Sequence, residues 1–123
     1  MKITLSGIER AEKKAEKIED RAWADAVKDR DGWKCVICSD PIKPNAHHII
    51  PRENRCSRLK IENGITLCVK HHKFDRLISA HNNPIAFFFW LAENRPVQFG
   101  KAKDTYEELL YATRPVAETS TGY

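Results

Sequence analysis

CVIC at residues 35–38 and CVKH at residues 68–71 decide the fold of this chain. Each stretch carries two donor side chains with two residues between them, which is the spacing of zinc ligands. Such a pair can sit on a tight turn that points both donors at one ion, and thiolates with an imidazole complete a closed tetrahedral site. We therefore predict a structural zinc ion held by Cys35, Cys38, Cys68 and His71.

A structural metal suits a chain of 123 residues, because it supplies folding free energy that a small core lacks. The alternatives are buried free cysteines, or two disulfides in an exported protein. Two correctly spaced pairs argue against free cysteines, and the start of the sequence shows no signal-peptide hydrophobic region. Cys56 has no evident partner in the sequence, and we expect that it is not a ligand.

The composition is that of one globular domain, which we expect to span residues 1–123. Hydrophobic residues make up 41% of the chain and charged residues 31%, without the depletion that marks disorder. The length allows a single core and a single active site. No apolar run approaches the roughly 20 residues that a membrane span needs. The sequence therefore predicts a soluble, cytoplasmic protein without a membrane partner.

Basic residues are concentrated in one window, residues 43–60. The formal net charge of +4 points only weakly to a polyanionic partner. The window, however, holds five basic residues and one acidic residue, and it adjoins the histidines discussed below. A solvated loop is the usual interpretation of such a run, but this location favours contact with phosphates. The candidates are Arg52, Arg55 and Arg58.

Periodicity and turn residues divide the chain into a core with helical flanks. Residues 1–29 form a long amphipathic N-terminal helix, with a capping box at Ser6-Gly7-Ile8-Glu9 and apolar spacing through about residue 30. The core occupies about residues 30–80. A helical C-terminal extension covers residues 81–114, and residues 115–123 are expected to be a flexible tail.

Within these regions the apolar segments predict individual elements. We expect two short strands with turns among the strand-length pieces at residues 33–37, 46–50 and 65–69. Helices are expected at residues 70–79, from Asn83-Pro84 to about residue 94, and at residues 104–111. The aromatic run at residues 87–90 is expected to pack in the core against the N-terminal helix. The predicted fold class is α+β.

Two pairs of adjacent histidines, at residues 47–48 and 71–72, indicate a second centre. Neighbouring side chains diverge by about 100° on a helix and 180° on a strand, so one ion cannot easily take both members of a pair. If His71 completes the zinc site, His72 points elsewhere. His47 or His48 would meet it there.

At this point the residues resemble the HNH nuclease family. The segments that carry the resemblance are residues 30–35 with Cys38, residues 46–51, and residues 63–68 followed by His71-His72, in order and with ordinary spacing. Each motif alone is weak, but the combination is specific and covers roughly residues 30–80. The resemblance implies a ββα-metal fold, here with structural zinc knuckles, a long N-terminal helix and C-terminal helices.

The resemblance also implies a role for each matched residue. His47 and His72 would be ligands of a catalytic divalent cation, and His48 would be the general base that activates water. Asn63 would be the second catalytic residue, which braces the connecting loop and helps to orient the base. Many relatives have Asp where His47 stands and Cys where His71 stands, which leaves the ion open among Mg²⁺, Mn²⁺, Ni²⁺ and Zn²⁺.

In some relatives a further metal ligand lies one helical turn after the last histidine of the motif, where this chain has Arg76. That difference suggests two protein ligands completed by water and phosphate oxygens. His81 lies outside the motifs, and we expect a structural role for it, with service at the metal site as the lesser alternative.

The implied function is a metal-dependent DNA endonuclease that hydrolyses phosphodiester bonds, with double-stranded DNA as partner. One such site cuts one strand at a time, so the protein acts as a monomer or as a homodimer. Phage, mobile-element, restriction and packaging settings all fit. The main alternative is a non-catalytic zinc-knuckle module that binds nucleic acid. A third hypothesis is a protein-interaction domain that uses the aromatic run at residues 87–90.

Overall fold

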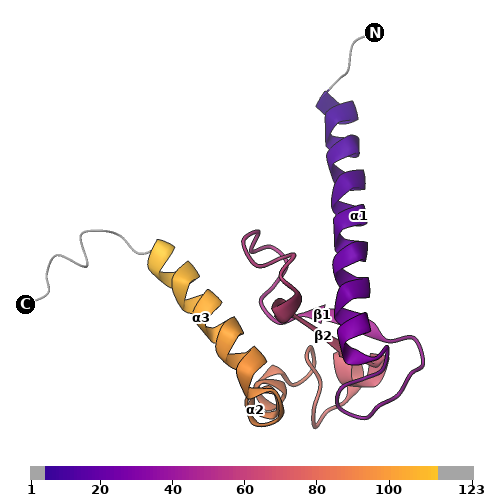
Figure 1. The fold of residues 1–123 in the computed structure, drawn as a ribbon, viewed down its shortest axis with the longest axis vertical. Coiled ribbons are helices and arrows are strands. Elements are labelled where there is room, and N and C mark those ends of the chain that lie inside the picture. Colours follow the sequence, from indigo (N-terminus) through magenta and orange to yellow (C-terminus); the bar gives the residue numbers. More distant parts are fainter. Residues whose placement is uncertain (1–4, 114–123) are drawn as a thin grey trace, which may run out of the picture.

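The chain folds into helices around a small two-stranded antiparallel sheet, as the predicted α+β class requires. The structure is a computed structural model and describes residues 5–113. Figure 1 shows α1 and α3 extending away from the sheet on opposite sides of the loop that joins β1 to β2. The elements are α1 Leu5–Asp31, β1 Asn45–His48, the 3-10 turn η1 Ile61–Asn63, β2 Gly64–Leu67, the π-helical turn η2 Lys70–Phe74, α2 Pro84–Asn94 and α3 Pro96–Thr113.

The register of the sheet separates the two adjacent histidines of β1. His47 pairs with Ile65 and His48 pairs with Gly64, so the two imidazoles lie on opposite faces. All four residues of β2 are buried. The His48 face lies against α1, whereas the His47 face adjoins the part of the core that α2 and α3 cover.

Helix α1 covers one face of the sheet with its C-terminal part. Trp23 and Val27 are buried there, whereas Ile18 near the middle of the helix is 65% exposed. The long N-terminal helix is therefore confirmed. The helix already includes Leu5, so the capping box expected at Ser6 does not begin it.

The start of α2 is the one that the sequence predicts. Asn83 precedes Pro84, and its side-chain oxygen accepts a hydrogen bond from the backbone N–H of Ala86 at 3.2 Å. The helix buries Phe87 and Leu91 among residues of the sheet, the two cysteine turns and α3. The expected packing of this aromatic run against α1 is therefore wrong.

Two expected helices need correction, whereas the turn at one of the three strand-length pieces agrees with the expectation of two strands with turns. The helix expected at residues 70–79 is a single π-helical turn that ends at Asp75, where the side chain accepts hydrogen bonds from the backbone N–H groups of Leu77 and Ile78. Residues 33–37 form turns rather than a strand, because the backbone bends back at Gly32 and Trp33, with φ of 73° and 58°. The last helix is α3, which is longer than the expected residues 104–111.

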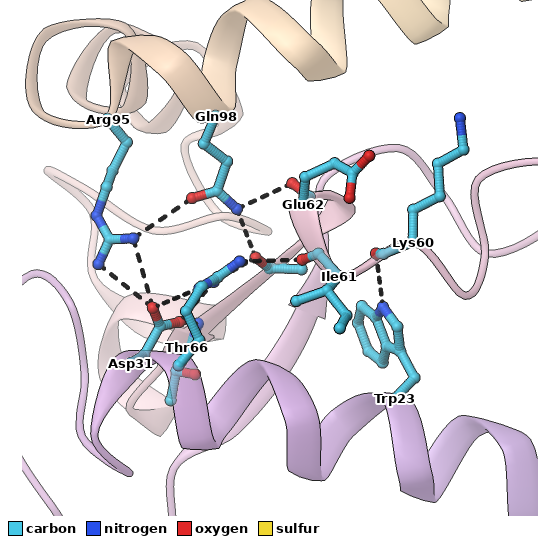
Figure 2. Close-up of polar contacts among 10 residues, drawn as sticks. Trp23, Asp31, Lys60, Ile61, Glu62, Thr66, Arg95 and Gln98 are labelled. Atoms are coloured by element: carbon cyan, nitrogen blue, oxygen red, sulfur yellow. Dashed lines mark hydrogen bonds and ion pairs between the residues drawn. The ribbon is translucent and has the colours of Figure 1, made fainter.

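A polar network ties α1, β2 and α3 together (Figure 2). The buried carboxylate of Asp31 accepts hydrogen bonds from the backbone N–H of Thr66 at 3.0 Å and from Arg95 at 3.4 Å. Gln98 of α3 donates to the carbonyl oxygens of Glu62 and Gly64. Side chains of both long helices are thereby hydrogen-bonded to the backbone of β2.

Among the residues that the structure describes, the helices are either too short or too polar to cross a membrane.

Candidate functional site

Four donor side chains form a compact cluster below the sheet. Their ligand atoms all lie within 4.8 Å of one another, with Cys68 Sγ 3.3 Å from His71 Nδ1 and 3.7 Å from Cys38 Sγ. Cys35 Sγ is 3.6 Å from the same His71 nitrogen. The predicted set of Cys35, Cys38, Cys68 and His71 is thus brought together, and its donors are compatible with zinc.

Local backbone structure produces this convergence. In the first pair, the N–H of Ser39 donates to the carbonyl of Cys35 at 2.8 Å, and Ser39 takes a positive φ of 65°. In the second pair, the N–H of His71 points at Cys68 Sγ at 3.5 Å. These are the tight turns that spacing by two residues permits, and a hydrogen bond from Val36 N–H to Thr66 O joins the first turn to β2 at 3.1 Å.

The thiols of the cluster differ in their electrostatics. Burial raises the pKa of the Cys35 thiol, but backbone N–H groups, that of Cys68 foremost, outweigh burial and leave it lowered. Burial raises the pKa of Cys38 to about 11. The protein therefore eases ionisation of Cys35 relative to an ordinary cysteine, whereas ionisation of Cys38 at neutral pH requires the charge of a bound cation.

Asp75 lies behind His71, outside the cluster of four donors, and the sequence analysis did not identify it. Its carboxylate faces His71 Nε2 at 4.0 Å, on the opposite side of the ring from the cysteines. The backbone N–H groups of Ile78 and Leu77 lower the pKa of Asp75, so that it is ionised at neutral pH. A carboxylate behind a ligating imidazole orients the ring and raises its basicity.

A second cluster consists of three imidazoles, those of His47, His72 and His81. Their ligand nitrogens lie within 4.8 Å of one another, and His72 Nε2 is 3.0 Å from His81 Nε2. The convergence of His47 with His72 agrees with the prediction, and His71 and His72 do diverge to separate clusters. The structure adds His81, which places a third donor where two were expected.

His81 reaches this cluster through backbone pairing. The N–H of Ala80 donates to the carbonyl of His71 at 2.9 Å, and the N–H of His81 donates to that of His72 at 3.0 Å. This pairing is possible because η2 ends at Asp75 and the chain turns back. A regular helix through residue 79 would have carried His81 away, so no motif spacing signalled that His81 joins this cluster.

Burial keeps the imidazoles of His47 and His72 neutral. It lowers the pKa of His47 to about 3, with His72 and His81 adding to the effect, and it lowers the pKa of His72 to about 4. Neutral imidazoles present lone pairs at pH 7. The three imidazoles of this cluster face one another, and such a donor set suits a divalent transition metal.

His48 lies in a separate environment on the α1 face of β1. Its ring stacks on the indole of Trp23, and its Nε2–H donates to the carbonyl oxygen of Arg58 at 3.0 Å. This bond selects the tautomer in which Nδ1 carries the lone pair. Burial lowers the pKa of His48, an effect that the Arg58 carbonyl partly offsets, so the ring is neutral at pH 7. Sequence reasoning did not identify Trp23.

Asn63 braces the loop between the strands. Its side chain is buried, accepts from the backbone N–H of Ile50 at 2.7 Å, and donates to the carbonyls of Ile50 and Ser57. Ser57 precedes Arg58, whose carbonyl holds His48. Asn63 therefore influences the His48 ring through the loop, as a positioning residue.

The arginines of the basic window are paired with carboxylates of α1. Arg52 binds Asp20 at 2.7 Å, Arg55 binds Glu16 at 2.6 Å, and the buried Arg58 binds Asp20 and Glu19 at 2.6 and 3.1 Å. Contact of these arginines with phosphates stays a prediction, and their pairing with α1 left no signal in the sequence. Phosphate contact by Arg52 and Arg55 would have to displace the carboxylates.

A cleft of about 700 Å³ opens beside His47 and His48, both of which line it. It lies between β1 and the helices α2 and α3. Its walls are mostly apolar and include Phe88 and Tyr106. The cleft therefore adjoins the part of β1 that carries both candidate histidines, with the His47 ring near Phe87 and the His48 ring against Trp23.

Comparisons of this chain with models of protein families, with curated proteins and with solved structures find no match.

Proposed function

We propose that this protein is a metal-dependent DNA endonuclease of the HNH type, with a ββα-metal core made of β1, β2 and the η2 turn. The observation that carries the proposal is that two neighbouring histidines have different surroundings. His47 belongs to a cluster of three imidazoles, whereas His48 is held by Arg58 O with Nδ1 carrying a lone pair. A cation site beside a positioned base is the minimum that phosphodiester hydrolysis requires.

The histidine cluster would hold the cation. His47, His72 and His81 would bind it, which replaces the expected two-residue site with a three-residue one. When bound, a divalent cation polarises the phosphodiester and stabilises the leaving 3′ oxygen. The all-imidazole donor set favours Zn²⁺, Ni²⁺ or Mn²⁺ over Mg²⁺, which prefers oxygen ligands.

His48 would take the proton from the attacking water. The hydrogen bond to Arg58 O fixes the tautomer, and the lowered pKa keeps the ring unprotonated at pH 7. After the transfer, the imidazolium would be stabilised by the same carbonyl. General-base assistance of this kind is worth about 10²–10⁴-fold in rate.

The Cys35, Cys38, Cys68 and His71 cluster would have a structural role. It holds three thiol donors and one imidazole, and a fourfold protein ligand set leaves no position for substrate. A non-catalytic zinc-knuckle module would need this cluster alone. The three imidazoles and the tautomer-fixing bond of His48 favour the nuclease over that alternative.

Conversion of supercoiled plasmid to nicked and linear forms tests the proposal. Purified protein is assayed with Mg²⁺, Mn²⁺, Ni²⁺, Zn²⁺ or EDTA, beside His48→Ala and His81→Ala. We expect His48→Ala to bind DNA but to lose cleavage by about 10²–10⁴-fold, with partial rescue by imidazole in solution. His81→Ala should instead require a higher concentration of the ion. Full cleavage by His48→Ala, or no cleavage by the wild-type protein with any ion, would overturn the proposal.

A further inference from the structure

The cleft beside the histidines has the shape and chemistry of a ligand site rather than of a packing defect. Its volume of about 700 Å³ falls within the roughly 300–1,000 Å³ range of small-molecule sites. The cleft is lined by His47 and His48 of β1 and by residues of α3. A molecule in the cleft would therefore reach from α3 to the candidate catalytic residues.

Aromatic rings stand partly exposed along this cleft. Phe88 is 43% exposed and Tyr106 is 52% exposed, although both line a largely apolar hollow. Phe87 lies deeper and is buried. Exposed aromatic surface of this extent costs free energy in water, and its concentration in a concave site marks a place where a flat apolar ligand binds.

We propose that this cleft binds an unpaired nucleobase of the strand that is cleaved, next to the scissile phosphate. The proposal rests on the proposed nuclease function and names its substrate class: DNA with a base outside the duplex stack. Bases inside a duplex show only their edges in the grooves, whereas a base outside the stack offers its faces to aromatic side chains.

Two observations favour a nucleobase over another occupant. The cleft is continuous with the His47 and His48 site, so a nucleotide whose phosphate lies at the histidines would carry its base directly into it. Lys103 is the one side chain with a permanent charge among the described residues that line the cleft, and it matches a neighbouring phosphate. Its ammonium group lies 3.9 Å from the carboxylate of Glu107 in an exposed pair, which a phosphate of the bound strand would compete with.

The test uses two duplexes that carry the fluorescent base aminopurine, either bulged and unpaired or fully paired. Each is titrated with the full-length protein in EDTA, so that binding is measured without cleavage. Stacking quenches aminopurine, and we expect quenching of the bulged probe alone. Because loss of a stacking partner weakens binding by about tenfold, Phe88→Ala and Tyr106→Ala should each weaken binding to this extent. Phe89→Ala is the matched control, because Phe89 is 67% exposed and lies outside the cleft.

The outcomes separate this proposal from the nuclease assignment. Plasmid cleavage without quenching of the bulged probe, or equal affinity of Phe88→Ala and wild-type protein for that probe, overturns the cleft proposal and leaves the nuclease in place. Quenching without any metal-dependent cleavage keeps the base-binding cleft and overturns the nuclease. Sedimentation adds a third readout: a wild-type dimer that Phe88→Ala converts to monomer means that a second copy fills the cleft, which also overturns the proposal.

Discussion

The imidazole of His48 lies flat against the indole of Trp23, with ring centroids 3.8 Å apart and planes inclined by 5°. The same indole donates its Nε1–H to the carbonyl of Lys60 at 2.8 Å. Helix α1 therefore holds both the candidate base and the end of the loop that supplies its hydrogen-bond partner. In this fold the long helix is part of the candidate site, not only a cover for the sheet.

The first prediction concerns this stack. Trp23→Leu should remove the ring-current shielding of the His48 ring protons, which nuclear magnetic resonance measures directly. It should also lower the free energy of unfolding by about 1–3 kcal/mol, because a large buried ring and its hydrogen bond are lost. Trp33→Leu is the control, since Trp33 is 45% exposed. Unchanged His48 resonances in Trp23→Leu would contradict the stacked geometry.

The second prediction concerns two glycines. A Cβ at Gly64 would collide with Val27 and would lie 2.6 Å from Trp23 Cζ2, whereas a Cβ at Gly100 would meet nothing within 4 Å. Gly64→Ala should therefore destabilise the fold by about 1–3 kcal/mol. Gly100→Ala, inside α3, should stabilise it by about 0.5–1 kcal/mol. Urea unfolding of both variants measures the difference, and equal midpoints would mean that α1 does not sit this close to β2.

Local sequence signals predicted the parts of the fold whose causes are local. Spacing by two residues located the cysteine turns, and Asn83-Pro84 located the start of α2. Adjacency of His71 and His72 correctly required two separate clusters. Each of these follows from geometry within a few residues, so no tertiary information was needed.

The remaining features depend on contacts between distant segments. His81 enters its cluster because the backbone of residues 80–81 pairs with that of residues 71–72, and Arg58 loses its availability because α1 lies beside the loop. Neither fact leaves a periodic or spacing signal. The stack of Trp23 on His48 is of the same kind, since the two residues belong to different elements.

The third prediction concerns the cysteine cluster. Cys68→Ser should lower the zinc content of the purified protein and its melting temperature together, because a thiolate donor is lost and metal binding is coupled to folding. Cys56→Ser is the control, since Cys56 is exposed and lies outside the cluster. Elemental analysis and thermal unfolding give the two readouts. A melting temperature unaffected by Cys68→Ser would count against a structural metal.

The fourth prediction separates the arginines of the loop. Arg55 is 61% exposed in its pair with Glu16, so Arg55→Ala should change stability by less than about 1 kcal/mol. If Arg55 exchanges Glu16 for a phosphate, the variant should bind DNA with a smaller salt dependence. The slope of log affinity against log salt concentration should fall by about one. Arg58 is only 6% exposed, and Arg58→Ala should cost about 1–3 kcal/mol instead. Fluorescence anisotropy across salt concentrations decides the role of Arg55, and an unchanged slope would remove it from the DNA contacts.

The last prediction follows from the ionisation of Asp31. Burial raises the pKa of its carboxyl, but the hydrogen bond and charge of Arg30, with the N–H of Thr66, outweigh burial and leave the pKa below its usual value. A carboxyl whose pKa is lower in the folded state stabilises the fold at any pH above the pKa that it has in the unfolded chain, which is about 3.9. This contribution is lost as the pH falls through the folded pKa.

Asp31→Asn should therefore destabilise the protein at pH 7 by about 1–3 kcal/mol, because Arg30 and Arg95 lose a buried charged partner. The difference from wild type should shrink as the pH falls below about 4, because the unfolded carboxyl then binds a proton, and it should vanish only below the lowered pKa of the folded state. Urea unfolding from pH 7 to pH 3 measures it, with the exposed Asp25→Asn as a control that should show little change. A difference that stayed constant across this range would mean that Asp31 stabilises the junction of α1, β2 and α3 through packing rather than through its charge.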